Sequence, residues 1–146
     1  MVPNDELASP TAETGATPAA APRVLLVGVD PALVDFRALP GLTAAEVRGA
    51  RAEVDAELAA AGLTVERCVL DLGATAEATL RRALVDGDFT CVVIGAGVRV
   101  VPENLPLFER VVNTVHRLAP EAAIGFNTDP ADTADAVRRA LATTRP

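Results

Sequence analysis

The chain has 146 residues and a net charge of −7 at pH 7, which gives room for one ordinary domain and repels phosphate backbones and anionic lipid headgroups. We therefore expect one domain with no nucleic-acid partner. No apolar run approaches the roughly 18 to 20 residues that a membrane-spanning helix needs, and the amino terminus lacks the basic and apolar regions of a signal peptide. These features predict a soluble cytoplasmic protein without a membrane partner.

Several residue types are absent from the sequence, and their absence limits the catalytic mechanisms that the protein can use. All 13 basic residues are arginine, and lysine, tyrosine and tryptophan are absent. This excludes Schiff-base chemistry on lysine, a phosphate-loop lysine and a tyrosine acid. The only serine, Ser9, lies near the amino terminus, so a serine nucleophile in the folded body is excluded as well. Catalysis would have to use Asp, Glu, Thr, Cys or the single histidine, His116.

The chain begins with a segment of distinct composition. Residues 1–22 are rich in Pro, Ala, Thr and Glu without periodicity, so they bury too little apolar surface to offset the cost of ordering. We predict a disordered tail over 1–22 and a single α/β domain over 23–146. Within the domain, apolar runs and helical periodicity predict strand 24–29, helix 43–61, strand 64–72, helix 75–85, strand 91–96, helix 105–119, strand 122–127 and helix 130–142.

The helix over 43–61 has recognisable signals at both ends. Thr43 and Glu46 have the spacing of a capping box, in which each side chain bonds the backbone of the other residue. Leu42 and Val47 have the spacing of a hydrophobic staple. Gly62 follows the last apolar position, where a left-handed residue commonly ends a helix.

The alternation of strands and helices predicts a three-layer α/β/α sandwich around a four-stranded parallel sheet. Strands 24–29 and 91–96 are unbroken apolar runs that suit the interior of the sheet, whereas strand 64–72 carries Glu66 and Arg67 and suits an edge. The strand order is then 2-1-3-4, a flavodoxin-like arrangement. The fourth strand is left as an exposed edge, and pairing of two copies along it as a homodimer is a further hypothesis.

In such a sheet, ligands bind beyond the carboxyl ends of the strands where the strand order reverses, here between the first and third strands. The loops that leave these two strands exceed the roughly 2 to 6 residues typical of such connections. They and the end of the fourth strand supply the candidate ligand-binding residues Asp30, Asp35, Arg37, Gly97, Arg99, Glu103, Asn104, Asn127 and Thr128.

Two of these candidates, Arg37 and Arg99, favour a carboxylate or phosphate ligand, because guanidinium groups complement anions. The alternative is that they form ordinary ion pairs with acidic residues of their own loops, such as Asp35 and Glu103. The Gly-Ala-Gly at 95–97 supplies only part of a dinucleotide-binding fingerprint and follows the third strand, so we interpret it as a turn or a close backbone approach.

Other chemically capable residues have structural interpretations. Cys68 and Cys91 lie inside predicted strands without metal-ligand spacing, which indicates reduced core thiols. His116 falls about three turns into its helix, away from the predicted site, and Asp71 is expected to be an exposed turn residue. We predict no metal site, and no feature of the sequence indicates a particular cofactor.

Four segments carry a resemblance to other proteins: 24–36 (VLLVGVDPALVDF), 91–99 (CVVIGAGVR), 107–116 (LFERVVNTVH) and 125–137 (GFNTDPADTADAV). Together they resemble a group of small, single-domain, flavodoxin-like or Rossmann-like hypothetical proteins without an assigned activity. The resemblance implies the same α/β fold over roughly 23–141. It implies no reaction, cofactor or ligand.

Three functions are compatible with these observations. The first is binding of a small anionic ligand, with Arg37 and Arg99 holding the anion and Asp30, Glu103 and Asn127 orienting the rest. The second is an enzyme that uses Asp30 or Glu103 as a general base in the same pocket. The third is a regulatory module that binds another protein through a helix or the open edge of the sheet.

Overall fold

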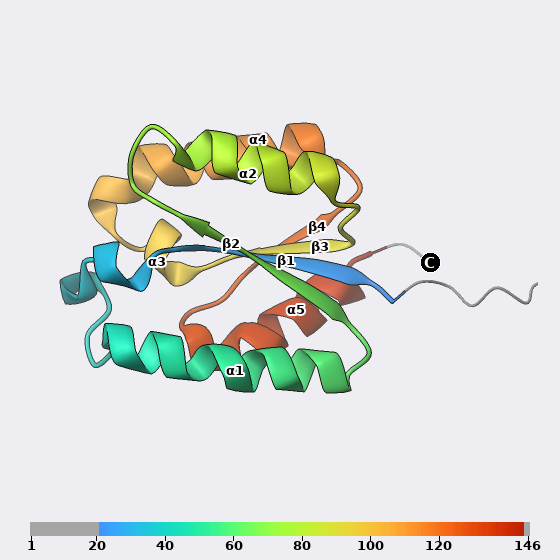
Figure 1. The fold of residues 1–146 in the computed structure, drawn as a ribbon, viewed down its shortest axis with the longest axis horizontal. Coiled ribbons are helices and arrows are strands. Elements are labelled where there is room, and N and C mark those ends of the chain that lie inside the picture. The colour runs from blue at the N-terminus through green and yellow to red at the C-terminus, as the bar shows by residue number, and fades with distance from the viewer. Residues whose placement is uncertain (1–20, 145–146) are drawn as a thin grey trace, which may run out of the picture.

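A computed structural model describes residues 21–144 and has alternating strands and helices (Figure 1). The described part includes only residues 21–22 of the predicted tail, and the carbonyl of Pro22 accepts a hydrogen bond from the Thr64 amide at 2.9 Å. The strands are β1 (Arg23–Val29), β2 (Thr64–Leu70), β3 (Cys91–Ile94) and β4 (Ala123–Phe126), and the helices are α1 (Ala44–Ala60), α2 (Ala76–Asp86), α3 (Ala96–Arg99), α4 (Leu105–Leu118) and α5 (Thr133–Ala142).

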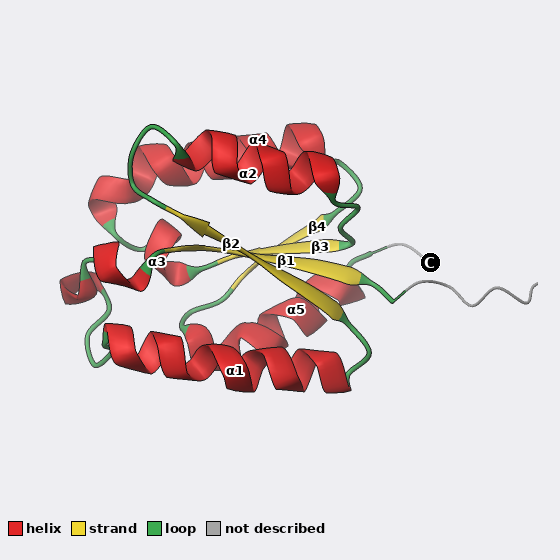
Figure 2. Cartoon of the chain, viewed as in Figure 1, coloured by secondary structure: helices red, strands yellow, loops and turns green. Residues whose placement is uncertain are grey.

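The four strands form one parallel sheet in the order β2-β1-β3-β4, as predicted. Helices α2 and α4 cover one face of the sheet, and α1 and α5 cover the other (Figure 2). The interior strands β1 and β3 are apolar and almost fully buried, whereas β2 at the edge exposes Glu66. Parallel strands place all their carboxyl ends at one end of the sheet, the end at which α3 lies (Figure 1).

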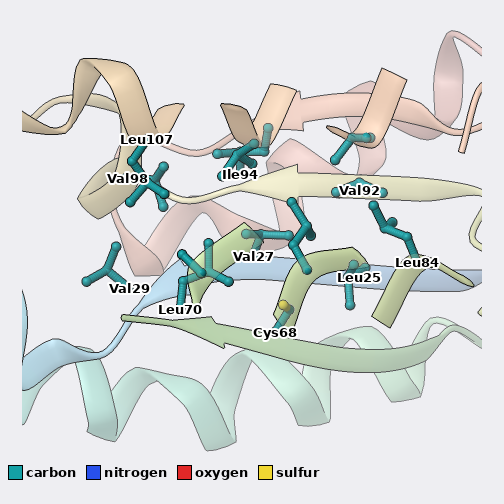
Figure 3. Close-up of a cluster of buried hydrophobic side chains, with 14 of the residues drawn as sticks. Leu25, Val27, Val29, Cys68, Leu70, Leu84, Val92, Ile94, Val98 and Leu107 are labelled. Carbon is teal, nitrogen blue, oxygen red and sulfur yellow. The ribbon is translucent and has the colours of Figure 1, made fainter. Parts of the chain in front are cut away.

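Two apolar cores lie on the two faces of the sheet because side chains alternate along each strand. On the α2 and α4 face, Leu25 and Val27 of β1 pack among residues of the neighbouring strands and helices (Figure 3). On the opposite face, Leu26 of β1 packs with Val54 of α1 and Val137 of α5. The pocket described in the next subsection lies on this second face of the sheet.

The predicted ends of α1 are confirmed. The Thr43 hydroxyl accepts a hydrogen bond from the Glu46 amide at 3.1 Å, and the Glu46 carboxylate accepts one from the Thr43 amide at 2.9 Å. Gly62 has φ +85°, the left-handed conformation expected where a helix ends. Local sequence signals therefore set the length of the helix that covers the site.

The third strand is shorter than predicted, because the chain after Ile94 turns into the short helix α3. The Asn127 side chain from beyond β4 accepts a hydrogen bond from the Ala96 amide at 2.8 Å and so satisfies the first turn of α3. The second strand likewise ends at Leu70, because Asp71 accepts a hydrogen bond from the Gly73 amide at 3.1 Å and turns the chain.

Both cysteines are buried and free, and burial raises the pKa of each thiol to about 11. In the unfolded chain these thiols ionise near pH 9, about two pH units below the folded protein. Between these two values, ionisation therefore stabilises the unfolded state relative to the folded one. Their stabilising contribution is complete below pH 9 and is lost as the pH rises through 11. At pH 10 each cysteine should lower the free energy of unfolding by about 1 kcal/mol.

Urea unfolding at pH 8 and pH 10 measures this effect, and the absence of lysine and tyrosine keeps other side chains from titrating in the same range. The wild type should lose about 2 kcal/mol more than a variant carrying both Cys68→Ala and Cys91→Ala. An equal loss of stability in the two proteins would contradict the conclusion that burial raises the pKa of the two thiols.

Candidate functional site

A pocket of about 100 Å³ lies between α1 and the carboxyl ends of the interior strands, at the predicted switch point. Its lining comes from β1 and the following loop, α1, β2, β3 and the loops after β3 and β4. The lining residues are Leu26, Val27, Gly28, Val29, Val34, Phe36, Leu39, Leu42, Val47, Ala50, Arg51, Val54, Arg67, Cys68, Val69, Val93, Gly95, Ala96, Gly97, Asn127, Pro130 and Thr133.

Glycine forms the floor of the pocket. The side chains of Leu26 and Val93 pack against α1 and α5, and two residues further along the chain lie Gly28, in β1, and Gly95, directly after β3. A Cβ atom added to Gly28 would meet no atom within 4 Å. Because Gly28 lies in an interior strand, this open space is the pocket itself, and the lack of a side chain at this position keeps it empty.

The loop between β1 and α1 forms an apolar wall. Asp30 accepts a hydrogen bond from the Ala32 amide at 2.9 Å, and Asp35 accepts one from the Arg37 amide at 3.1 Å, so each carboxylate caps a short 3₁₀ turn. These two turns, Pro31–Leu33 and Phe36–Ala38, fold the loop over the sheet end. The side chains that reach the pocket from this loop are apolar: Val34, Phe36, Leu39 and Leu42.

Two arginines line the pocket on its β2 side. Nη2 of Arg67 on β2 donates to Asp55 Oδ1 at 2.8 Å and to the Arg51 carbonyl at 3.3 Å, while its Nε is buried without an acceptor in the described part of the chain. Arg51 on α1 lies beside it and makes no side-chain hydrogen bond or ion pair with any residue between 21 and 144. Arg51 and Arg67 thus have guanidinium N–H groups that no acceptor among residues 21–144 binds.

The charge of Arg51 is poorly compensated. Partial burial lowers the pKa of its guanidinium, the positive charge of Arg67 lowers it further, and the negative charge of Asp30 only partly opposes both effects. Removal of a charged group from water and placement beside a like charge both disfavour that charge. An anion bound between Arg51 and Arg67 would relieve both costs and supply an acceptor.

The polar groups on the opposite side of the pocket already have partners. Asn127 Oδ1 accepts from the Ala96 amide at 2.8 Å, and Asn127 Nδ2 donates to Thr133 Oγ1 at 3.0 Å. The Thr133 hydroxyl in turn donates to the Pro130 carbonyl at 2.8 Å. Asn127 therefore ties the loops after β3 and β4 together beside the pocket.

The arginines chosen from the sequence have other contacts, although Nε of Arg99, like that of Arg67, is buried without an acceptor among residues 21–144. Arg37 makes two contacts of 2.9 Å with Asp35 and is 91% exposed, which is the local ion pair considered as the alternative. This hydrogen bonding lowers the pKa of Asp35. Arg99 donates to the Asn127 carbonyl at 2.6 Å and lies over the Phe126 ring at 5.8 Å. Neither arginine lines the pocket.

Of the other residues predicted for the site, only Gly97 and Asn127 line the pocket. Asn104 is buried and donates to the Gly97 carbonyl at 3.1 Å. Thr128 hydrogen-bonds Asp132 through both its amide and its hydroxyl, and Glu103 is exposed. The contacts of Asn104 and Thr128 order the loops around the site.

The two glycines of the Gly-Ala-Gly segment allow the backbone to pass close to β1 and the loop that follows it. A Cβ on Gly95 would lie 3.3 Å from the Val27 carbonyl oxygen, and one on Gly97 would lie 3.3 Å from Val34 Cγ2. Neither glycine has a positive φ. They therefore let α3 sit close to β1 and its loop, in agreement with the interpretation from the sequence.

The sequence carries a signal for Arg51 and Arg67 that is independent of any motif. Arg51 lies four residues after Val47 and three before Val54, so it is a charge within the apolar stripe of α1. Arg67 pairs in register with Leu26, and so projects from the same face of the sheet. A charged residue on a buried face is the unusual feature in each case.

Comparison of the chain with known protein families and with proteins of described function found no match. Within residues 21–144, no helix is long and apolar enough to cross a membrane, and no three His, Cys, Asp or Glu side chains are grouped as metal ligands are. The geometry of the pocket is therefore the basis for a functional assignment.

Proposed function

We propose that the protein binds a small anionic ligand in the pocket at the carboxyl ends of β1 and β3, with Arg51 and Arg67 holding the anion. The observation that carries this proposal is the Arg51 guanidinium, which lines the pocket beside Arg67 and has no partner among residues 21–144. The buried and unpartnered Nε of Arg67 supports it, because a carboxylate or phosphate oxygen would supply the missing acceptor.

Binding is favoured over catalysis by the composition of the lining. In the described part of the chain, no Asp, Glu or His lines the pocket, and the raised pKa of Cys68 keeps that thiol protonated at neutral pH. Asp30 and Glu103, the acids considered as general bases, lie outside the lining. Pairing of two copies along β4, a cytoplasmic location and the absence of a nucleic-acid partner stay separate predictions.

The test is thermal unfolding of the full chain against small carboxylates, inorganic phosphate and phosphorylated sugars, for the wild type and for Arg51→Met. A ligand present at 100 times its dissociation constant should add about 2.7 kcal/mol of stability to the wild type. Arg51→Met keeps the aliphatic stem and removes the charge, so the free variant should be about as stable as the wild type while its ligand-dependent shift disappears.

Arg37→Met is the matched control, because it removes a guanidinium from the neighbouring loop that is 91% exposed and does not line the pocket. Its ligand-dependent shift should equal that of the wild type. If Arg37→Met rather than Arg51→Met removed the shift, the anion would bind at the loop and the proposed site would be incorrect.

A further inference from the structure

The pocket also indicates which anion it accepts. Resting on the function proposed above, we infer that the ligand is a short carboxylic acid with a compact apolar body, such as a branched aliphatic acid, rather than a phosphorylated sugar or nucleotide. The carboxylate would lie between Arg51 and Arg67, and the body would fill the space above Gly28.

The lining outside the two arginines is apolar where the body would lie. Val34 and Phe36 come from the loop after β1, Val47 and Val54 come from α1, and the floor is Gly28. An aliphatic body gains from burial against such walls, by about fourfold in affinity per methylene. Sugar hydroxyls would leave water for walls that are mostly apolar, which costs free energy.

The polar groups at the far side cannot easily serve a polyhydroxylated ligand. Asn127 Oδ1 is occupied by the Ala96 amide, and the Thr133 hydroxyl both accepts from Asn127 and donates to Pro130. These bonds hold two loops together and leave a sugar only the second lone pairs of Asn127 Oδ1 and Thr133 Oγ1 and the second N–H of Asn127 Nδ2. An apolar body leaves these bonds intact.

The volume limits the size of the body. The pocket measures about 100 Å³, whereas an apolar cavity that takes up benzene measures roughly 150 Å³ and pockets for drug-sized ligands measure roughly 300–1,000 Å³. A body of about three to five carbon atoms suits this volume. A nucleoside is much larger and would remain mostly outside.

The charge is matched by a monoanion. Arg67 already shares its charge with Asp55, at 2.8 Å, so the pair has one guanidinium, that of Arg51, without a carboxylate. A carboxylate of charge −1 balances this excess. It can also accept two hydrogen bonds in one plane, which suits guanidinium donors.

The test measures dissociation constants by isothermal titration calorimetry on the full chain. The probes are 3-methylbutanoate, acetate, 3-methylbutanamide and glycerol 3-phosphate, each with the wild type, Arg51→Met and Gly28→Val. Wild type should bind 3-methylbutanoate at least about tenfold more tightly than the other three, because only this probe combines a carboxylate with an apolar body of four carbon atoms. Arg51→Met should weaken that binding by about tenfold or more.

Gly28→Val tests whether the apolar body of the ligand lies above Gly28, because the valine side chain would occupy that space. This variant should bind 3-methylbutanoate at least about tenfold more weakly while its melting temperature stays near that of the wild type. Unchanged affinity in a folded Gly28→Val would overturn the inference.

The anion-binding proposal and the apolar-acid inference can be overturned separately. Arg51-dependent binding of glycerol 3-phosphate that equals or exceeds binding of 3-methylbutanoate would overturn the apolar-acid inference and leave the anion-binding proposal standing. Equal binding of the acid and its amide, or no Arg51-dependent binding of any anion, would overturn both.

Discussion

Gly125→Val should lower the free energy of unfolding by about 3 kcal/mol, whereas Gly28→Val should change it by less than about 1 kcal/mol. Both glycines lie in strands of the same sheet, but their surroundings differ. A Cβ on Gly125 would lie 3.1 Å from the Ala140 Cβ and 3.2 Å from the Ala136 carbonyl oxygen, so a valine would force α5 away from β4. A Cβ on Gly28 would enter open space.

Urea unfolding followed by circular dichroism measures both variants against the wild type. The loss of conformational freedom in the unfolded chain and the preference of valine for strands should offset part of any cost at Gly28. Comparable destabilisation of the two variants would mean that the space above Gly28 is closed in solution, and the pocket would then not exist as described.

Asn127→Ala is expected to destabilise the protein by about 2 to 3 kcal/mol. The substitution removes the acceptor of the Ala96 amide and the donor to Thr133, and these groups are buried. A buried polar group left without a partner costs more than the net value of the hydrogen bond it lost. Because Asn127 joins the loops after β3 and β4, ligand binding at the pocket should weaken as well.

Asn113→Ala provides a control of the same residue type. Asn113 is exposed on α4, and among residues 21–144 its side chain donates only to the Glu109 carbonyl one turn earlier, at 2.9 Å. This variant should stay within about 0.5 kcal/mol of the wild type by urea unfolding. Equal effects of the two substitutions would show that Asn127 does not hold the loops together.

The predicted fold agrees with the structure because it depends on two kinds of signal. One is the pattern of apolar and charged residues along each strand, and the other is contacts between residues close in the sequence. The apolar residues of 24–29 and 91–94 suit interior strands, and the charges of Glu66 and Arg67 place their strand at the edge. The cap of α1 involves Thr43 and Glu46, which are three residues apart. Such features require no knowledge of distant parts of the chain.

The end of the third strand was less predictable because a distant residue determines it. The third strand gives way to α3 at Gly95, where Asn127 bonds the Ala96 amide from 31 residues further along the chain. A strand prediction that continued through Ala96 could not include this contact. The nearby 3₁₀ turns of the loop after β1 depend on Asp30 and Asp35, which the sequence analysis considered as ligand-binding groups instead.

The sequence was sufficient to predict the α/β sandwich, the strand order and the end of the sheet where a pocket lies, because topology alone places the switch point there. The side chains that form the pocket required the tertiary structure. Arg51 and Arg67 are 16 residues apart and meet only because α1 packs over the edge strand. Arg37, by contrast, pairs with Asp35 two residues away, since a nearby partner is reached at lower cost in chain entropy than a distant one.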